Sequence, residues 1–301
     1  MANKNLFKKI ASVAMAGALT LSMALPVSAA TDDPNLVVEA NTKYSTQIEA
    51  EKSVTLALMP GDDFYQRSGF DSKEDAETGL EVRSVTFGSD KLTGDYEYGY
   101  METTDYNGDE TFAGTVKVTG AKGAYGPASL HIVNTHNEDA AIDMTVYVEA
   151  DKTQDAVKVS KVSVRDVSGK NAINVTSNDL SVAAATTTTG NPFYNAEGSA
   201  QSYPTVGDAL YSMVQANGMS FTQNGGYVNS ITNSKGNKIE AYSDANWNYY
   251  GWNYCVYRNG KKVAAGDILS ASVLETEAGD NVYWAFGTYA QATAYFATCN
   301  N

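Results

Sequence analysis

Short runs of alternating apolar and polar residues recur along the first half of the chain. The clearest are Thr115–Val118, Leu130–Val133 and Met144–Val148, with clusters of Gly, Asp and Asn between such runs. A period of two predicts strands that bury one face. The predicted strands are Ser53–Leu58, Leu80–Phe87, Phe112–Val118, Ala128–Asn134 and Ala141–Glu149. Short strands at this spacing predict a β-sandwich over residues 31–150.

From about residue 151 the pattern predicts strands around a single helix. Val157–Val167 alternates with a phase slip near Lys161 that indicates a bulge, and Ile173–Val182 follows as a second strand. Later strands are expected at Tyr227–Ile231, Val282–Tyr289 and Ala292–Ala297.

One amphipathic helix interrupts these strands. Its buried stripe consists of apolar residues at helical spacing, Val206, Leu210, Met213 and Val214. Thr205 suits the N-cap, Asp208 makes a capping-box partner and Gly218 supplies the stop, so the helix is predicted over Val206–Asn217. One helix on a small mixed sheet predicts a β-grasp-like domain over residues 151–301. The predicted fold class of the whole chain is therefore mainly β / α+β.

The segment Trp247–Lys261 holds the densest run of aromatic residues. Bulky residues alternate along it until Asn259-Gly260, which predicts a strand that ends in a type I′ turn. Alternation should place Trp252, Tyr254 and Val256 on one face and Asn253, Cys255 and Tyr257 on the other.

The aromatic residues are open to two interpretations. Trp252 and Trp284 are expected mainly in the core, because burying a large aromatic side chain stabilises a fold by a few kcal/mol. Trp247 instead lies in a polar loop that ends in Gly251, which is also typical of a recognition surface. The candidate ligand-binding residues are Trp247, Tyr249, Tyr250, Trp252 and Tyr254.

Residues 1–30 are typical of a secretory signal peptide. A basic start with Lys4, Lys8 and Lys9 precedes the apolar run Ile10–Leu25, and small residues follow in Pro26–Ala30. The style resembles leaders of Gram-positive bacteria. We therefore expect a secreted or extracellular protein, or one loosely associated with the cell surface, without membrane insertion after cleavage.

The charge balance narrows the range of partners. The chain has 35 acidic and 21 basic side chains, a formal net charge of −14, and loses three lysines with the leader. Such a surface disfavours nucleic acid and anionic membranes, both of which attract basic patches.

The two cysteines, Cys255 and Cys299, form a candidate disulfide, because an oxidising compartment favours pairing. A bridge would tie the C-terminal end of the chain to the hairpin, and two unpaired thiols are the alternative. The loop with Asp105, Asn107 and Asp109 has oxygen side chains at alternate positions, as a Ca²⁺ loop does. Its glycine precedes the third ligand position instead of following it, so a solvated turn is the simpler interpretation. No other metal site is expected.

Four blocks of the second half resemble one known family. They are Thr205–Leu210, Gly226–Ile231, Gly251–Lys261 and Gly279–Trp284, in that order. Together they look like the transcobalamin-like C-terminal domain family over roughly residues 156–289. In the carriers of that family the domain forms one wall of a corrinoid site. The resemblance therefore implies cobalamin as a ligand, with Trp252, Tyr254 and the preceding Trp247 and Tyr249 as the positions that would contact it. The first half resembles the Ig-like modules of bacterial surface proteins in architecture alone.

Two functions are expected from these features, and neither is enzymatic, because no catalytic or phosphate-binding motif occurs. The first is a secreted bacterial binding protein whose C-terminal domain captures a corrinoid (cobalamin) or a similar ligand. The alternative is an extracellular adhesion or scaffold module that contacts glycan, peptide or a surface protein through its aromatic loop. No cofactor is required by either.

Overall fold

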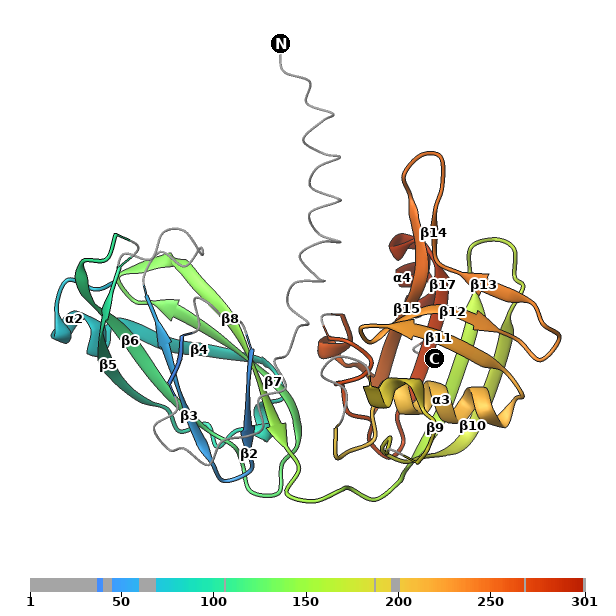
Figure 1. The fold of residues 1–301 in the computed structure, drawn as a ribbon, viewed down its shortest axis with the longest axis horizontal. Helices are drawn as coiled ribbons and strands as arrows, with labels where there is room; N and C mark the ends of the chain where they lie inside the picture. The colour runs from blue at the N-terminus through green and yellow to red at the C-terminus, as the bar shows by residue number, and fades with distance from the viewer. Residues whose placement is uncertain are drawn as a thin grey trace, which may run out of the picture. The chain divides into compact units, whose positions relative to one another are not determined.

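The computed structural model describes residues 37–39, 45–59, 69–105, 107–186, 188–195, 201–267 and 269–299. The predicted signal peptide lies outside these residues. The chain forms two compact units, which meet in sequence between Lys152 and Thr153 (Figure 1). Strands dominate both units and helices are few, so the predicted fold class, mainly β / α+β, is confirmed.

The N-terminal unit is a sandwich of two four-stranded sheets. One has the order β1-β3-β6-β5 and the other β2-β8-β7-β4. The strands are β1 (Val37–Glu39), β2 (Ser45–Glu49), β3 (Ser53–Leu58), β4 (Leu80–Phe87), β5 (Glu97–Thr104), β6 (Glu110–Thr119), β7 (Gly126–Asn134) and β8 (Asn137–Glu149). Strand β1 pairs within the first sheet and strand β2 within the second. The leading part of the chain thus contributes to both sheets, as it does in immunoglobulin-type sandwiches.

The two sheets of this unit enclose a common apolar core. Alternate residues of each strand point inward, among them Leu56 of β3, Val116 of β6, Leu130 of β7 and Val146 of β8, all of which are fully buried. The helix α2 (Lys73–Thr78) closes one end through Ala76.

The acidic residues around Ser72 have a composition that is typical of a loop. In the structure they begin helix α2. The Ser72 hydroxyl accepts a hydrogen bond from the backbone N–H of Asp75 at 3.0 Å. Two acidic residues, Glu74 and Asp75, stand in the first turn, where they favour the positive end of the helix dipole.

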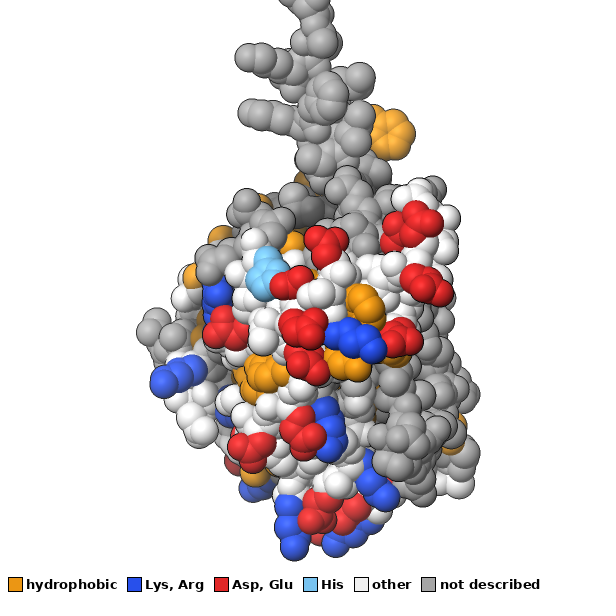
Figure 2. Space-filling model, turned by 90° about the vertical axis from the view of Figure 1, so that its left-hand side faces the viewer, with side chains coloured by type: hydrophobic (Ala, Val, Ile, Leu, Met, Phe, Trp, Pro, Cys, Tyr) orange, Lys and Arg blue, Asp and Glu red, His pale blue; other side chains and the backbone are white. Residues whose placement is uncertain are grey.

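The described part of the surface in Figure 2 carries acidic side chains interspersed with lysines and arginines, not a continuous basic patch. This distribution agrees with the acidic balance of the sequence.

The C-terminal unit is built on a mixed sheet with the order β10-β9-β17-β15-β14, and β16 pairs with β15 at its end. Its strands are β9 (Val157–Asp166), β10 (Asn174–Val182), β14 (Tyr242–Ser243), β15 (Tyr249–Arg258), β16 (Lys261–Lys262) and β17 (Asn281–Gly287). The last strand, β17, inserts between β9 and β15, parallel to the first and antiparallel to the second. A central parallel pair of first and last strands is the arrangement of a β-grasp sheet.

The phase slip predicted near Lys161 is present. The pairing of β9 with β10 omits Ser160 and Asp179, and Asp179 takes a left-handed φ of 55°. The slip lets Val159 and Val162 both lie buried although they are three residues apart.

Helix α3 (Val206–Ala216) confirms the predicted helix. The Thr205 hydroxyl accepts from the Asp208 N–H, and the Asp208 carboxylate accepts from the Thr205 N–H, which completes the capping box. The helix packs against β9 and β10 through Leu210, Met213 and Val214. A second sheet follows, formed by β11 (Ser220–Asn224), β12 (Tyr227–Thr232) and β13 (Lys238–Glu240).

The strand predicted at Ala292–Ala297 is wrong, because this segment belongs to helix α4 (Tyr289–Ala297). The physical reason is a second capping box, in which the Thr288 hydroxyl accepts from the Gln291 N–H and the Gln291 side chain accepts from the Thr288 N–H. Alanine-rich sequence then favours the helix. Ala292 and Phe296, four residues apart, pack onto β15 and β17.

Candidate ligand-binding hairpin

The strand β15 carries most of the candidate site, and both of its faces are packed along the second half of its length. The predicted turn after it is confirmed, since Asn259 and Gly260 have φ values of 52° and 75°. Cys255 and Tyr257 lie under α4, and the Tyr257 hydroxyl donates to the Phe296 carbonyl at 2.8 Å.

Two candidate residues, Trp252 and Tyr254, pack against the neighbouring strand β17. The Trp252 ring lies 5.3 Å from the ring of Phe286, and the Tyr254 ring lies 5.3 Å from that of Trp284. Trp252 is only 8% exposed, and the Tyr254 hydroxyl donates to the Leu269 carbonyl at 2.6 Å. Both side chains are therefore engaged by the fold and offer a ligand little surface.

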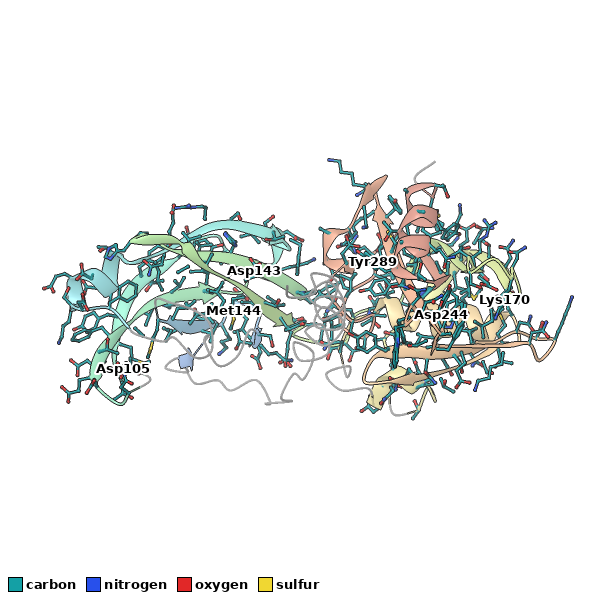
Figure 3. The ribbon with its side chains drawn as sticks, turned by 90° about the horizontal axis from the view of Figure 1, so that it is seen from above. Asp105, Asp143, Met144, Lys170, Asp244 and Tyr289 are labelled. Carbon is teal, nitrogen blue, oxygen red and sulfur yellow. The ribbon has the colours of Figure 1, made fainter. Side chains whose placement is uncertain are left out.

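The other three candidates lie at the front of β15, where it pairs with β14 to form a hairpin. Figure 3 labels Asp244, the first residue of its loop. The Asp244 carboxylate accepts hydrogen bonds from the backbone N–H groups of Asn246 and Asn248, at 2.8 and 2.9 Å. The Asp244 N–H donates to the Asn248 carbonyl, and the Trp247 N–H donates to the Asp244 carbonyl. The loop is thus fixed by its own first residue.

Two further hairpins of the protein have the same loop. In 105–109 and 233–237 the first residue, Asp or Asn, accepts the same two N–H groups through its side chain and makes the same two backbone hydrogen bonds. The fourth residue has a left-handed backbone in all three, and it is Gly108 with φ 89°, Gly236 with φ 82° and Trp247 with φ 64°. The aromatic loop therefore places tryptophan where its two counterparts have glycine.

This position is costly for tryptophan. A left-handed conformation costs an L-residue about 1–2 kcal/mol, which glycine avoids. Trp247 is 85% exposed, so packing offsets little of that cost. A strained and exposed tryptophan is the pattern expected when a residue is retained for an external contact.

The two tyrosines that follow point to different surroundings. Tyr250 stacks on Tyr242 of β14 with ring centroids 4.8 Å apart and an interplanar angle of 4°. The Lys170 ammonium lies 5.4 Å from the centre of the Tyr242 ring and covers that stack. Tyr249 is 62% exposed, and its ring lies along the strand over Gly251.

Tyr227, at the start of β12, belongs to the same surface and was not among the predicted residues. It is 41% exposed. Partial burial raises the pKa of its phenol, and the neighbouring phenol of Tyr249 raises it further. The signal was present only in three dimensions, because the two tyrosines are 22 positions apart in sequence and lie in different sheets, whose strands β12 and β15 contact each other.

The charge of the hairpin is low and internally satisfied. Residues 242–250 contain one ionisable acid, Asp244, and no lysine or arginine. Hydrogen bonds from the Asn248 side chain and backbone, followed by that of Asn246, lower the pKa of Asp244 despite a small opposing effect of desolvation. The carboxylate thus stays ionised and turned into its own loop.

The candidate Ca²⁺ residues form the same kind of loop instead of a cation cage. An oxygen of Asp105 accepts the backbone N–H groups of Asn107 and Asp109 at 2.7 and 2.9 Å. Among the described residues, no group of three or more His, Cys, Asp and Glu side chains could hold a metal ion.

Cys255 and Cys299 are free thiols in this structure, and the bridge between them stays a prediction. The structure brings them into one apolar cluster, with Cys255 buried and Cys299 packed at its edge at the end of α4. Burial raises the pKa of the Cys255 thiol to about 12. The thiolate is therefore scarce at neutral pH, and the thiol is chemically quiet.

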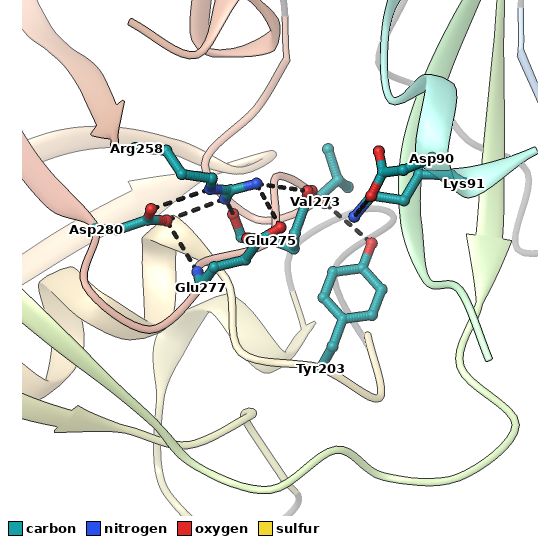
Figure 4. A network of polar contacts seen from close by, with 8 residues as sticks. All are labelled: Asp90, Lys91, Tyr203, Arg258, Val273, Glu275, Glu277 and Asp280. Atoms are coloured by element: carbon teal, nitrogen blue, oxygen red, sulfur yellow. Dashed lines mark hydrogen bonds and ion pairs between the residues drawn. The ribbon is translucent and has the colours of Figure 1, made fainter. Parts of the chain in front are cut away.

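A buried ion network fixes the far end of β15 (Figure 4). The Arg258 guanidinium donates to both oxygens of Asp280, each at 3.0 Å, and to Glu277 at 2.6 Å and Glu275 at 3.3 Å. Burial lowers the pKa of Arg258, but its acidic partners outweigh burial and raise it overall. These carboxylates hold the loop before β17 in place, and catalysis is not needed to explain them.

No known family profile matches the chain, and no curated protein matches it either. The solution structure of amebosin is similar over 39% of this chain and 100% of its own, at 13% identity and a TM-score of 0.24. So slight a likeness carries no argument about fold or function. In the part of the chain that the structure describes, no helix is long and apolar enough to cross a membrane.

Proposed function

We propose that the protein is an exported, non-catalytic binding protein that takes its ligand on the tip of the β14–β15 hairpin. The observation that carries the proposal is Trp247, which is 85% exposed in a left-handed conformation that two counterpart loops give to glycine. Export is supported by the leader-like sequence of residues 1–30 and by the acidic composition.

A binding role agrees with the structural tasks of two buried carboxyl groups that in another setting would suggest catalysis. Asp208, the most perturbed carboxyl, is occupied by the capping box of α3 and by the Asn191 side chain at 2.6 Å. Asp280 is occupied by Arg258. Each has a structural task, and neither lies in the aromatic hairpin.

Adhesion or scaffolding through the aromatic tip is the form that the geometry supports best. An exposed hairpin tip can lie against a surface or a polymer, whereas a corrinoid needs a concave wall that covers much of the ligand. Of the four positions that the family resemblance implies for the corrinoid, Trp252 and Tyr254 are engaged in packing against β17, and only Trp247 and Tyr249 are exposed.

Cobalamin capture is the second candidate. The observation in its favour is that the four blocks of the family resemblance fall in order on elements of one unit, namely α3, β12, the β15–β16 hairpin and β17. Cobalamin-agarose therefore belongs among the test materials.

The test compares retention of three purified proteins on bacterial cell walls, mucin-coated beads and cobalamin-agarose. The proteins are the wild type, Trp247→Gly and Tyr289→Ala, the last as a control that removes a 68% exposed aromatic side chain from α4. We expect the wild type and the control to be retained on at least one material and Trp247→Gly to be lost from it. Retention of Trp247→Gly equal to the wild type, or no retention of the wild type, overturns the proposal.

A further inference from the structure

The inference rests on the proposed function and names the class of ligand. It begins with Gly251, which has an ordinary strand conformation near the start of β15 and pairs with Gly287. A Cβ atom at Gly251 would lie 2.7 Å from Cε1 of the Tyr249 ring. Glycine therefore makes room for this position of the ring, which a Cβ atom would displace, and is not needed for the backbone. It lets the phenol lie flat on the strand, with one ring face toward solvent.

Two further aromatic side chains accompany this flat ring. Trp247 stands two residues earlier at the hairpin tip, and Tyr227 of β12 is close enough for its phenol to interact with that of Tyr249. A backbone hydrogen bond from Ala241 to Asn229 holds β12 beside the start of β14. We call Tyr227, Trp247 and Tyr249 the aromatic platform. Tyrosine and tryptophan provide rigid contact area at low cost in conformational entropy, as in antibody paratopes.

Within the hairpin itself, residues 242–250, Asp244 is the one carboxylate and there is no lysine or arginine. The cation placed beside the hairpin is Lys170, which lies over the Tyr242 ring and not over Trp247 or Tyr249. Asn246 and Asn248 are exposed beside Trp247, and their side chains are amides that can donate and accept hydrogen bonds. Residues 242–250 offer no cation to a phosphate or carboxylate, and the single carboxylate is turned into its loop. This chemistry fits a neutral ligand rich in hydroxyl groups.

We propose that the aromatic platform binds a neutral polysaccharide by stacking sugar rings on the faces of Trp247 and Tyr249. The negative face of an aromatic ring attracts the weakly positive C–H groups of a pyranose ring, and the neighbouring amides bind its hydroxyls. Gly251 is a positioning residue, because it holds the Tyr249 ring flat.

The first test is electrophoresis in native gels that contain xylan, galactomannan or hydroxyethyl cellulose. The wild type should be retarded in at least one of these gels, and Tyr289→Ala should be retarded equally. Trp247→Gly and Tyr249→Ala should each weaken binding about tenfold, which corresponds to about 1.4 kcal/mol, because each variant removes one stacking ring. Dextran sulfate, a polyanion, should not retard the wild type, and retardation by the polyanion alone overturns the proposal.

The role of Gly251 is tested by a double-mutant cycle. Gly251→Ala should weaken binding several-fold by tilting the Tyr249 ring, while the fluorescence-detected unfolding transition stays cooperative, because the ring is a movable side chain. In the Tyr249→Ala background the same substitution should have no further effect. An equal loss in both backgrounds contradicts the positioning role.

Failure of this inference differs from failure of the proposed function. If neutral polysaccharides do not retard the wild type but cobalamin-agarose or mucin retains it in a Trp247-dependent way, the hairpin binds and the ligand class is wrong. If polysaccharide binding is unchanged in Trp247→Gly, both are wrong.

Discussion

Replacing Trp247 by glycine and by alanine separates backbone strain from side-chain contact. Both variants remove the indole, so both should lose ligand binding to the same extent. In the folded protein they differ mainly in the cost of a left-handed backbone with φ 64°. We expect the glycine variant to be the more stable of the two, the reverse of the order found where the backbone is ordinary.

The magnitude follows from two opposing effects. Alanine keeps a left-handed strain of about 1–2 kcal/mol. Glycine removes that strain but loses about 0.5–1 kcal/mol through the greater freedom of its unfolded chain. The net difference is about 0.75 kcal/mol in favour of glycine at the midpoints of these ranges, and about 1.5 kcal/mol at most. Removal of the indole affects the packing of both variants equally, and its effect is small because the side chain is 85% exposed.

Urea unfolding followed by tryptophan fluorescence measures this difference in stability for the C-terminal unit. All three tryptophans, at positions 247, 252 and 284, belong to the C-terminal unit, and the remaining two are buried in both variants. Gly236→Ala provides a matched control, because it should destabilise the counterpart loop by a similar amount without affecting binding. An alanine variant as stable as the glycine variant would refute the argument that Trp247 is strained.

Three further outcomes are expected. Arg258→Met should destabilise the C-terminal unit by about 3–5 kcal/mol in urea unfolding, because it leaves buried carboxylates without their cation. The control Lys262→Met should cost less than about 1 kcal/mol, because the ion pair of Lys262 with Asp267 is exposed. Burial raises the pKa of Asp208 to about 6, so between about pH 4 and 6 the native state holds a proton that the unfolded state has released. The free energy of unfolding should therefore fall as the pH rises through this range. An Asp208→Asn variant whose stability declines equally over this range would disprove the assignment. Iodoacetamide should leave the thiol of Cys255 unlabelled in the native protein and label it in urea after reduction, as read by mass spectrometry; rapid native labelling would contradict its burial.

The elements that the sequence predicted well have strong local patterns. In the strands of the sandwich, apolar residues recur at every second position, and α3 has both a capping box and an apolar stripe. Helix α4 was missed because its short run of alanine and aromatic residues also suits a strand. The Thr288–Gln291 pair was the available sign. Strands as short as β13 and β14 depend on their partners and carry no such pattern.

The candidate site was predictable at its centre and not at its edges. The polar loop around Trp247 already indicated a recognition surface. The backbone strain at Trp247 could be inferred only from a comparison of residues 244–248 with 105–109 and 233–237, in which the fourth residue is glycine. Tyr227 joins the surface through the contact of β12 with β15, which lie in different sheets, and the role of Gly251 depends on the rotamer of Tyr249. Neither feature has a local signature.

The position of β17 has a consequence for how the C-terminal unit acquires its structure. The strand in the middle of the sheet is the last one in the chain, and both β9 and β15 depend on it for hydrogen bonds. Pairing β9 with β17 joins segments more than a hundred residues apart, which is slow to form. As the chain emerges from the ribosome, this sheet cannot close until β17, more than a hundred residues after β9, has been synthesised. The unit therefore stays open through almost all of its translation.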